Sequence, residues 1–157
     1  MIRTIPLAIM ATLALAPGAR AQCSCAVNQV TNDPTNLAAQ NLSSALSGNT
    51  VCVAKSGGGW ENQEYHQGGP STGNVIDYKR GPADPIDPTK ALGTWAISGT
   101  GTSTTVTYSY SGGSTGQYAV CSLNSQPGPG STIGYCANNI SRASFSATLQ
   151  AGPSACH

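Results

Sequence analysis

Charge is scarce in this chain and almost absent from its C-terminal part. Asp, Glu, Lys and Arg make up 8% of the 157 residues. Residues 91–157 contain one of them, Arg142. The chain therefore lacks the basic excess that nucleic-acid-binding proteins use, and it has no electrostatic attraction to anionic membranes. We expect neither a nucleic acid nor a membrane as a partner.

Long hydrophobic runs are missing beyond the N-terminus. A basic start at Arg3, an apolar run over 5–16 and small residues up to Ala21 predict a signal peptide over 1–21, too short to span a membrane stably. Its cleavage removes two arginines, so seven basic residues become five against six acidic ones, a net charge of −1. We expect one domain over 22–157 that is secreted or periplasmic.

An even number of cysteines in a chain predicted to be exported favours disulfides. The six are Cys23, Cys25, Cys52, Cys121, Cys136 and Cys156. Cys121 and Cys136 flank a turn-rich loop, which predicts a bond between them. Cys23 and Cys25 are too close to bond to each other comfortably, so we expect them to pair with the remaining two. The paired Cys-x₂₋₄-Cys arms of a zinc site are missing, and we expect no metal and no cofactor.

From residue 50 onward, apolar and polar residues alternate as in β-strands, and turn residues separate the segments. The predicted strands cover 50–54, 60–66, 74–80, 92–98, 104–111, 117–123, 132–136 and 140–149. Val106, Tyr108 and Tyr110 share one face of their strand, and Ala143, Phe145, Ala147 and Leu149 share one face of the last strand. Short connections favour a mainly β fold, an antiparallel meander of about eight strands closed into a small barrel or, alternatively, a sandwich. Barrels of the lipocalin and avidin kind are similar in architecture, although no motif carries their residues over to this chain.

One short helix is predicted before the first strand. Asp33 can cap it, Pro34 suits its first position, and Gly48 can end it. Leu42 and Leu46 belong to its apolar stripe. We expect this helix to cover or plug the sheet.

The candidate binding face lies on the hairpin of strands 60–66 and 74–80. Nine of the eleven charged residues outside the signal peptide fall between Lys55 and Lys90. Symmetric pairing about the connecting loop predicts a face of Trp60, Asn62, Glu64, His66, Ile76, Tyr78 and Arg80. An acid, an imidazole and a guanidinium among aromatic rings are typical of a small-ligand pocket. The predicted ligand-binding residues are Trp60, Glu64, His66, Tyr78 and Arg80. Alternatively, Glu64 and Arg80 neutralise each other and the rings are structural cover.

Other patterns give weak indications of chemistry. Glu61 and Glu64 are three apart on a strand, so they face opposite sides and cannot flank one glycosidic bond. Ser114 stands in a Gly-x-Ser-x-Gly pattern, but no helix is predicted after it, so we interpret it as a turn residue. Asp84 and Asp87 are more typical of turns than of a calcium site.

Three functions are compatible with these patterns. The leading hypothesis is a secreted, non-catalytic barrel that binds a small molecule or a glycan with its 60–80 hairpin. A second is a self-associating fibre or matrix subunit, because residues 91–157 lack the charges that usually protect open sheet edges. A third is a hydrolase that uses Glu64 and His66. A sheet that closes on itself would remove the edges that the second hypothesis requires.

Overall fold

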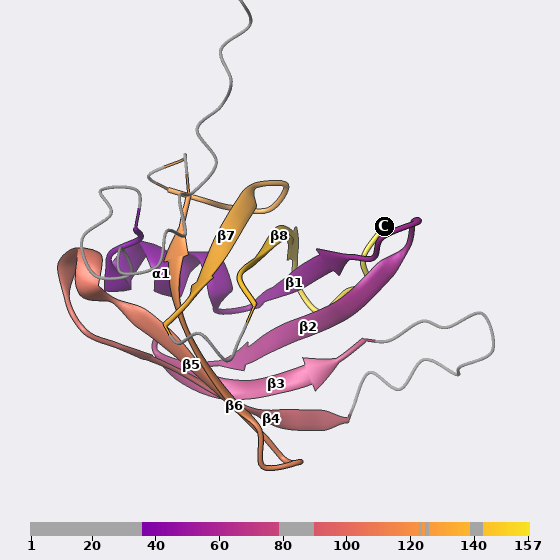
Figure 1. Ribbon diagram of the computed structural model, residues 1–157, viewed down its shortest axis with the longest axis horizontal. Coiled ribbons are helices and arrows are strands. Elements are labelled where there is room, and N and C mark those ends of the chain that lie inside the picture. The colour runs from indigo at the N-terminus through magenta and orange to yellow at the C-terminus, as the bar shows by residue number, and fades with distance from the viewer. Residues whose placement is uncertain (1–35, 79–89, 123, 125, 139–142) are drawn as a thin grey trace, which may run out of the picture.

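Eight antiparallel strands, each paired with its neighbour in sequence, close into a barrel in the computed structural model of this protein (Figure 1). The structure describes residues 36–78, 90–122, 124, 126–138 and 143–157. The elements are α1 (Ala39–Leu46), β1 (Asn49–Ala54), β2 (Trp60–Gly68), β3 (Thr72–Asp77), β4 (Ala91–Ser98), the 3₁₀ turn η1 (Gly101–Ser103), β5 (Thr105–Tyr110), β6 (Thr115–Cys121), β7 (Thr132–Ala137) and β8 (Phe145–Ala151). Pairing of β1 with β8 closes the sheet. The predicted mainly β barrel with one short helix is confirmed.

Alternating side chains build the wall of the barrel, because successive residues of a strand point to opposite faces. On β5, Tyr108 is buried and Ser109 is exposed. On β8, Ala147 and Leu149 are buried while Ser146 is exposed. The predicted inner faces of these two strands are therefore confirmed, and the interior is lined mainly by apolar and aromatic side chains.

Two strand glycines allow neighbouring backbones to approach closely. A Cβ atom at Gly93 on β4 would collide with the carbonyl oxygen of Ser109 on β5. A Cβ atom at Gly73 on β3 would likewise collide with the carbonyl oxygen of Gln67 on β2. Glycine inside a strand marks such close approaches and the sharp bends of small barrels.

The helix begins later than predicted. The expected cap at Asp33 and first position at Pro34 lie outside the described residues. The backbone N–H of Leu37 donates to the carbonyl oxygen of Val120 on β6, at 2.8 Å. Since this segment pairs with a strand, the chain turns helical only at Ala39.

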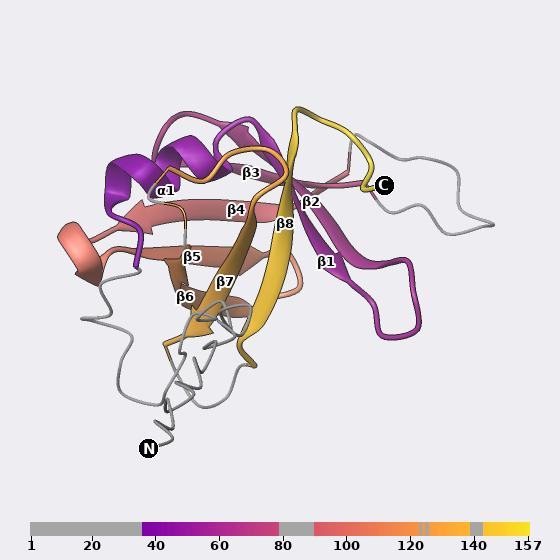
Figure 2. The ribbon, with the colours of Figure 1, turned by 90° about the horizontal axis from the view of Figure 1, so that it is seen from above.

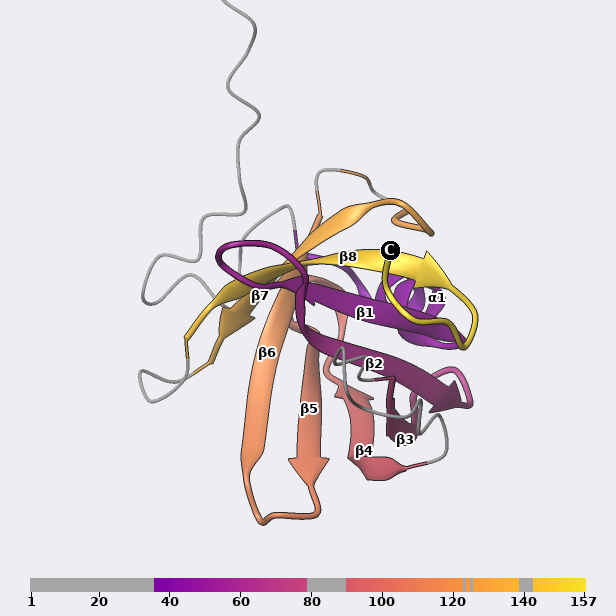
Figure 3. The ribbon, with the colours of Figure 1, turned by 90° about the vertical axis from the view of Figure 1, so that its right-hand side faces the viewer.

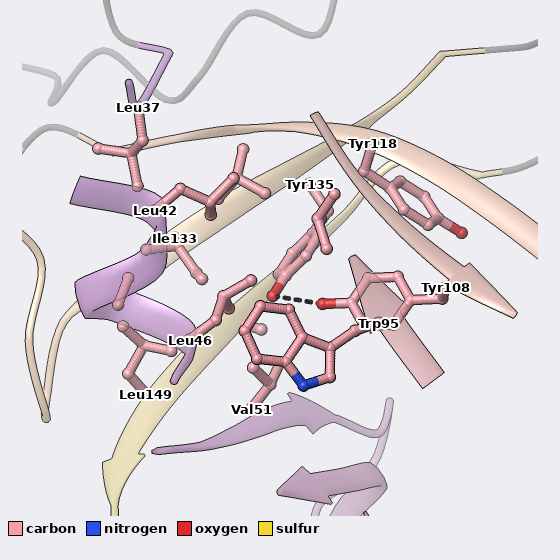
Figure 4. Packing of buried hydrophobic residues seen from close by; sticks show 14 of the residues in the cluster. Leu37, Leu42, Leu46, Val51, Trp95, Tyr108, Tyr118, Ile133, Tyr135 and Leu149 are labelled. Atoms are coloured by element: carbon pink, nitrogen blue, oxygen red, sulfur yellow. Dashed lines mark hydrogen bonds between the residues drawn. The ribbon is translucent and has the colours of Figure 1, made fainter. Parts of the chain in front are cut away.

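α1 covers the end of the barrel where β1 begins and β8 ends, and the turn between β1 and β2 lies at the opposite end (Figure 2). Leu42, Ala45 and Leu46 are buried, and Figure 4 shows the two leucines among interior side chains such as Ile133. Gly48, with φ +74°, leads from the helix into β1, as predicted. No helix in the described part of the chain is long and apolar enough to cross a membrane.

The hairpin of β2 and β3 has a tighter turn than the sequence suggested. The prediction centred the turn on Pro70. In the structure the turn consists of Pro70 and Ser71, and the N–H of Gly69 donates to the carbonyl oxygen of Thr72 at 3.0 Å. Because the length of the turn sets the register of a hairpin, the two strands pair one residue away from the predicted register.

This shift reverses the faces of β3. Tyr65 pairs with Ile76, so Ile76 and Tyr78 lie on the outer face of the sheet. There the rings of Tyr65 and Tyr78 meet edge to face, with centroids 6.1 Å apart. The predicted face that grouped Tyr78 with Glu64 and His66 is therefore wrong.

A disulfide fastens the C-terminal segment to the outside of the barrel. Cys52 on β1 is bonded to Cys156, and their Cα atoms are 5.8 Å apart. The N–H of Cys156 also donates to the side-chain oxygen of Gln63 on β2, at 2.7 Å. The sequence prediction, which paired each of these cysteines with one at the N-terminus, is wrong.

The predicted bond between Cys121 and Cys136 is also not formed. Both are disulfide-bonded, yet their sulfur atoms are 3.9 Å apart, about twice the length of a disulfide bond. Cys23 and Cys25, the two cysteines not yet accounted for, lie outside the described residues, as does the predicted signal peptide over 1–21.

Candidate ligand-binding site

The end of the barrel opposite α1 contains a cavity of about 330 Å³. Six strands and one turn supply its lining. The lining residues are Val51, Val53, Asn62, Glu64, Tyr108, Tyr110, Ser114, Tyr118, Tyr135 and Phe145. Ser114 belongs to the turn between β5 and β6, which lie side by side in Figure 3, and it is exposed at the rim. The cavity thus occupies the end of the barrel interior that α1 does not cover.

Three hydrogen-bonded side chains form a floor beneath the cavity: Tyr108 and Tyr135 line it, and His66 lies behind Tyr108 and is not among the lining residues. Nε2 of His66 lies 2.8 Å from the hydroxyl oxygen of Tyr108. That oxygen lies 3.3 Å from the hydroxyl oxygen of Tyr135 (Figure 4). All three residues are buried, and His66 and Tyr135 have no exposed surface. Below them lies the apolar core that α1 closes.

The geometry determines where the protons of this chain lie. Nδ1 of His66 is 3.1 Å from the backbone carbonyl oxygen of Glu64, and a carbonyl can only accept, so Nδ1 carries the proton. Nε2 of the neutral ring then accepts from the Tyr108 hydroxyl. Since the Tyr108 proton is used in this way, Tyr135 donates to the oxygen of Tyr108. Both hydroxyl protons of the chain therefore point toward His66.

Burial favours the neutral form of each floor residue. It lowers the pKa of His66 from 6.5 to about 4, and the hydrogen bond to the Glu64 carbonyl opposes this only partly. Burial raises the pKa of Tyr108 and of Tyr135 well above the usual value for tyrosine. The floor is therefore uncharged at neutral pH.

Glu64 places a carboxylate in the wall of the cavity. The hydroxyl of Tyr110 donates to its two oxygens, at 3.2 and 3.1 Å. Burial, and after it the negative charge of Glu64, raises the pKa of Tyr110 well above the usual tyrosine value. Tyr110 therefore keeps its proton and holds the carboxylate in one orientation.

Aromatic rings form most of the remaining wall. Tyr135 and Phe145 are stacked, with centroids 4.6 Å apart and an interplanar angle of 12°. The ring of Tyr118 stands edge to face with both, at 5.8 Å and 5.4 Å. Rings arranged in this way are held rigidly, because each packs against the others. The cavity consequently has fixed apolar walls.

The five predicted binding residues have different positions. Glu64 lines the cavity, whereas His66 lies behind Tyr108, to which it is hydrogen-bonded, and is not among the lining residues. Tyr78 is on the outer face of the sheet. Trp60 pairs with Ala54 beyond a register irregularity in β1 and is not among the lining residues. Arg80 lies outside the described residues.

Sequence reasoning missed several lining residues because they belong to distant strands. Tyr118, Tyr135 and Phe145 are supplied by β6, β7 and β8. The two-residue period did predict that Tyr108 and Tyr110 share one face of their strand, and that Phe145 and Leu149 share one face of theirs. Their meeting with Glu64 follows only from closure of the barrel.

The structure does not support a hydrolase mechanism for this site. Both ring nitrogens of His66 are engaged, one by a backbone carbonyl and the other by Tyr108, and the ring is fully buried. Ser114 is a turn residue followed by a strand, as predicted, and not by the helix that a nucleophile elbow requires. Among the described residues, no three His, Cys, Asp or Glu side chains are grouped so that they could hold a metal ion.

Comparisons with protein-family models, with curated proteins and with solved structures found no match to this chain.

Proposed function

We propose that this protein is a secreted, non-catalytic binding protein that holds a small molecule in the open end of its barrel. The observation that carries the proposal is the aromatic-lined cavity of about 330 Å³ with a few polar groups in its wall. Ligand pockets usually measure roughly 300–1,000 Å³ and combine apolar walls with a few oriented polar groups. The signal-like N-terminus and the disulfides support export.

The shape of the cavity favours a small molecule over a glycan chain. A chain needs a cleft that is open at both ends, whereas this cavity ends on the buried floor of His66, Tyr108 and Tyr135. A single terminal sugar remains within the proposal. The 60–80 hairpin contributes through Asn62 and Glu64, and the outer face with Tyr78 does not line the cavity.

No observation on the described residues supports the hypothesis of a fibre subunit. It required sheet edges open for strand addition between subunits. Within the described residues, each of the eight strands is hydrogen-bonded to a strand on both sides. Closure thereby provides the edge protection for which charged residues are normally used.

A thermal-shift screen of small molecules, followed by calorimetry on the hits, tests the proposal. Tyr118→Ala enlarges the cavity and Val53→Phe fills it, so both should abolish binding of the hits. Tyr78→Ala is the matched control, because it removes a tyrosine from the outer face of the same barrel, and it should leave binding unchanged. A screen without hits, or hits retained by both cavity variants, contradicts the proposal.

A further inference from the structure

The outer face of β6 and β7 is buried, although the outside of a barrel normally meets solvent. Tyr118 and Val120 belong to the core, so Ala119 and Cys121, which alternate with them on β6, point outward. Ala119 pairs with Cys136 of β7, which therefore shares this outer face. The three outward residues are 0%, 1% and 5% exposed and form a cluster apart from the core. Their burial indicates that a further segment lies over this face.

The cysteine count limits what can be bonded to this face. Cys121 and Cys136 are both disulfide-bonded, yet not to each other, because their sulfur atoms are 3.9 Å apart. Two others form the bond that fastens the C-terminal segment to β1. Of the six cysteines in the chain, Cys23 and Cys25 are the two that remain. Within one molecule they are therefore the available partners.

The segment that carries these two cysteines leads directly to β6. Asn36 forms a bridge with Cys121, and the N–H of Leu37 donates to the carbonyl oxygen of Val120 at 2.8 Å. Cys25 lies eleven residues before Asn36, and eleven residues span up to roughly 36–40 Å when extended. The connection is therefore long enough to bring the N-terminus back over the outer face.

The sequence around Cys23 suits a segment that lies on a sheet. In an extended chain, residues two apart point to the same side, so Cys23, Cys25 and Val27 share one side while Ser24 and Ala26 take the other. Both sulfur atoms can then point to the barrel wall at once. Cys23 and Cys25 are also too close in sequence to bond to each other comfortably.

We propose that the mature N-terminal segment, residues 22–35, docks on the outer face of β6 and β7. Two disulfides hold it there, one from each of Cys23 and Cys25 to one each of Cys121 and Cys136. The inner faces of the same two strands line the cavity, so the segment stabilises the cavity wall from outside. This is independent of the proposed function, because it concerns how the wall is held and not what the cavity binds.

Tryptic mapping of the mature protein, denatured without reduction, tests the pairing. Trypsin divides the six cysteines among peptides 22–55, 91–142 and 143–157. All three should appear as one species with the mass of one copy of each and no free thiol. Release of 91–142 as a separate peptide would show a bond between its own cysteines and overturn the proposal. A species with two copies of one peptide would overturn it as well, because a second molecule would then supply the partners.

Single cysteine variants locate the bonds. Cys136→Ala should leave one free thiol, and maleimide labelling of the unfolded variant should place it at Cys23 or Cys25. Cys121→Ala should leave the other of these two free. Cys156→Ala is the matched control, and it should free a thiol on β1 while the N-terminal pairing stays unchanged. Labelling at Cys121 in the Cys136→Ala variant would contradict the proposal.

Docking over the face, as distinct from bonding, is tested at Ala119. Ala119→Asp buries a carboxylate beneath the segment, so the melting temperature should fall by roughly 8 °C or more. Ser109→Asp, at an exposed outward position of β5, is the matched control and should change it by no more than about 2 °C. Equally small changes in both variants would show an uncovered face and overturn the docking.

Discussion

The two ends of this barrel are built from different side chains. The end covered by α1 is filled with aliphatic residues and one tryptophan, including Leu42, Leu46, Ile133 and Trp95, all without exposed surface. The opposite end is lined by tyrosines, a phenylalanine and a carboxylate around a cavity. The difference shows that one end is filled by packed side chains, whereas the other keeps the cavity in which we propose that a ligand binds.

A polar layer separates the two ends. The chain of hydrogen bonds from Tyr135 through Tyr108 to His66 and the Glu64 carbonyl satisfies each of its polar atoms inside the protein. Buried polar groups are tolerated when they are hydrogen-bonded in this way. Because its polar atoms are hydrogen-bonded to one another, the layer can be buried against the apolar core. Its two tyrosines line the cavity on the other side.

The largest effect is expected at the closed end. Trp95→Ala should lower the free energy of unfolding by about 3–5 kcal/mol, because it removes a fully buried side chain and leaves a void. Urea denaturation measures the change. Trp60→Ala, at a partly exposed position on β2, is the control and should cost less than half as much. Similar costs for both would contradict the division between packed interior and outer wall.

The polar layer should make stability depend on pH. The pKa of His66 is about 4 in the folded protein and 6.5 without burial, so between these values the unfolded chain binds more protons. Stability should be complete above pH 6.5 and should fall by about 3 kcal/mol as the pH drops to 4. Unfolding measured across this range, in wild type and in His66→Gln, tests this. If the two proteins share the same pH slope, His66 is not the group responsible.

Removing one hydroxyl from the polar layer should have a smaller effect. Tyr108→Phe leaves Nε2 of His66 without its donor and Tyr135 without its acceptor, at a cost of about 1–3 kcal/mol. Tyr65→Phe, on the outer face, should cost almost nothing, and its measured unfolding free energy is the reference. A loss as small for Tyr108→Phe would mean that the buried chain does not stabilise the fold.

The smallest effect is expected at the rim of the cavity. Tyr110→Phe removes a donor to Glu64, a partly exposed carboxylate that water can solvate instead, so it should cost about 1 kcal/mol or less. Denaturation of this variant beside Tyr108→Phe compares the rim with the floor directly. A larger loss at the rim than at the floor would reverse the proposed comparison.

Much of the barrel could be predicted, because alternation and turn residues are local properties of the chain. The eight strands, the inward faces of Tyr108 and Leu149 and the end of the helix at Gly48 all follow from neighbouring residues. The register of the hairpin could not be predicted so directly. Pro70 and its neighbours favour a turn, but whether that turn has an even or odd number of residues depends on how β2 and β3 pack.

The candidate site was only partly predictable for the same reason. Glu64 was identified because charge and aromatic residues concentrate near it in the sequence. Tyr118 and Tyr135 are more than fifty residues away, and their approach to Glu64 requires the sheet to close. The disulfide from Cys52 to Cys156 likewise joins segments that sequence spacing does not relate.

The amino-acid sequence by itself determined a sheet-rich domain with a capping helix, since a two-residue period and glycine-rich turns admit few other structures. Only the tertiary structure decided which inward faces meet, which sulfur atoms bond, and that a cavity remains at one end of the interior. The physical reason is that strand formation depends on adjacent residues, whereas a cavity depends on the distances between residues brought together when the first and last strands pair.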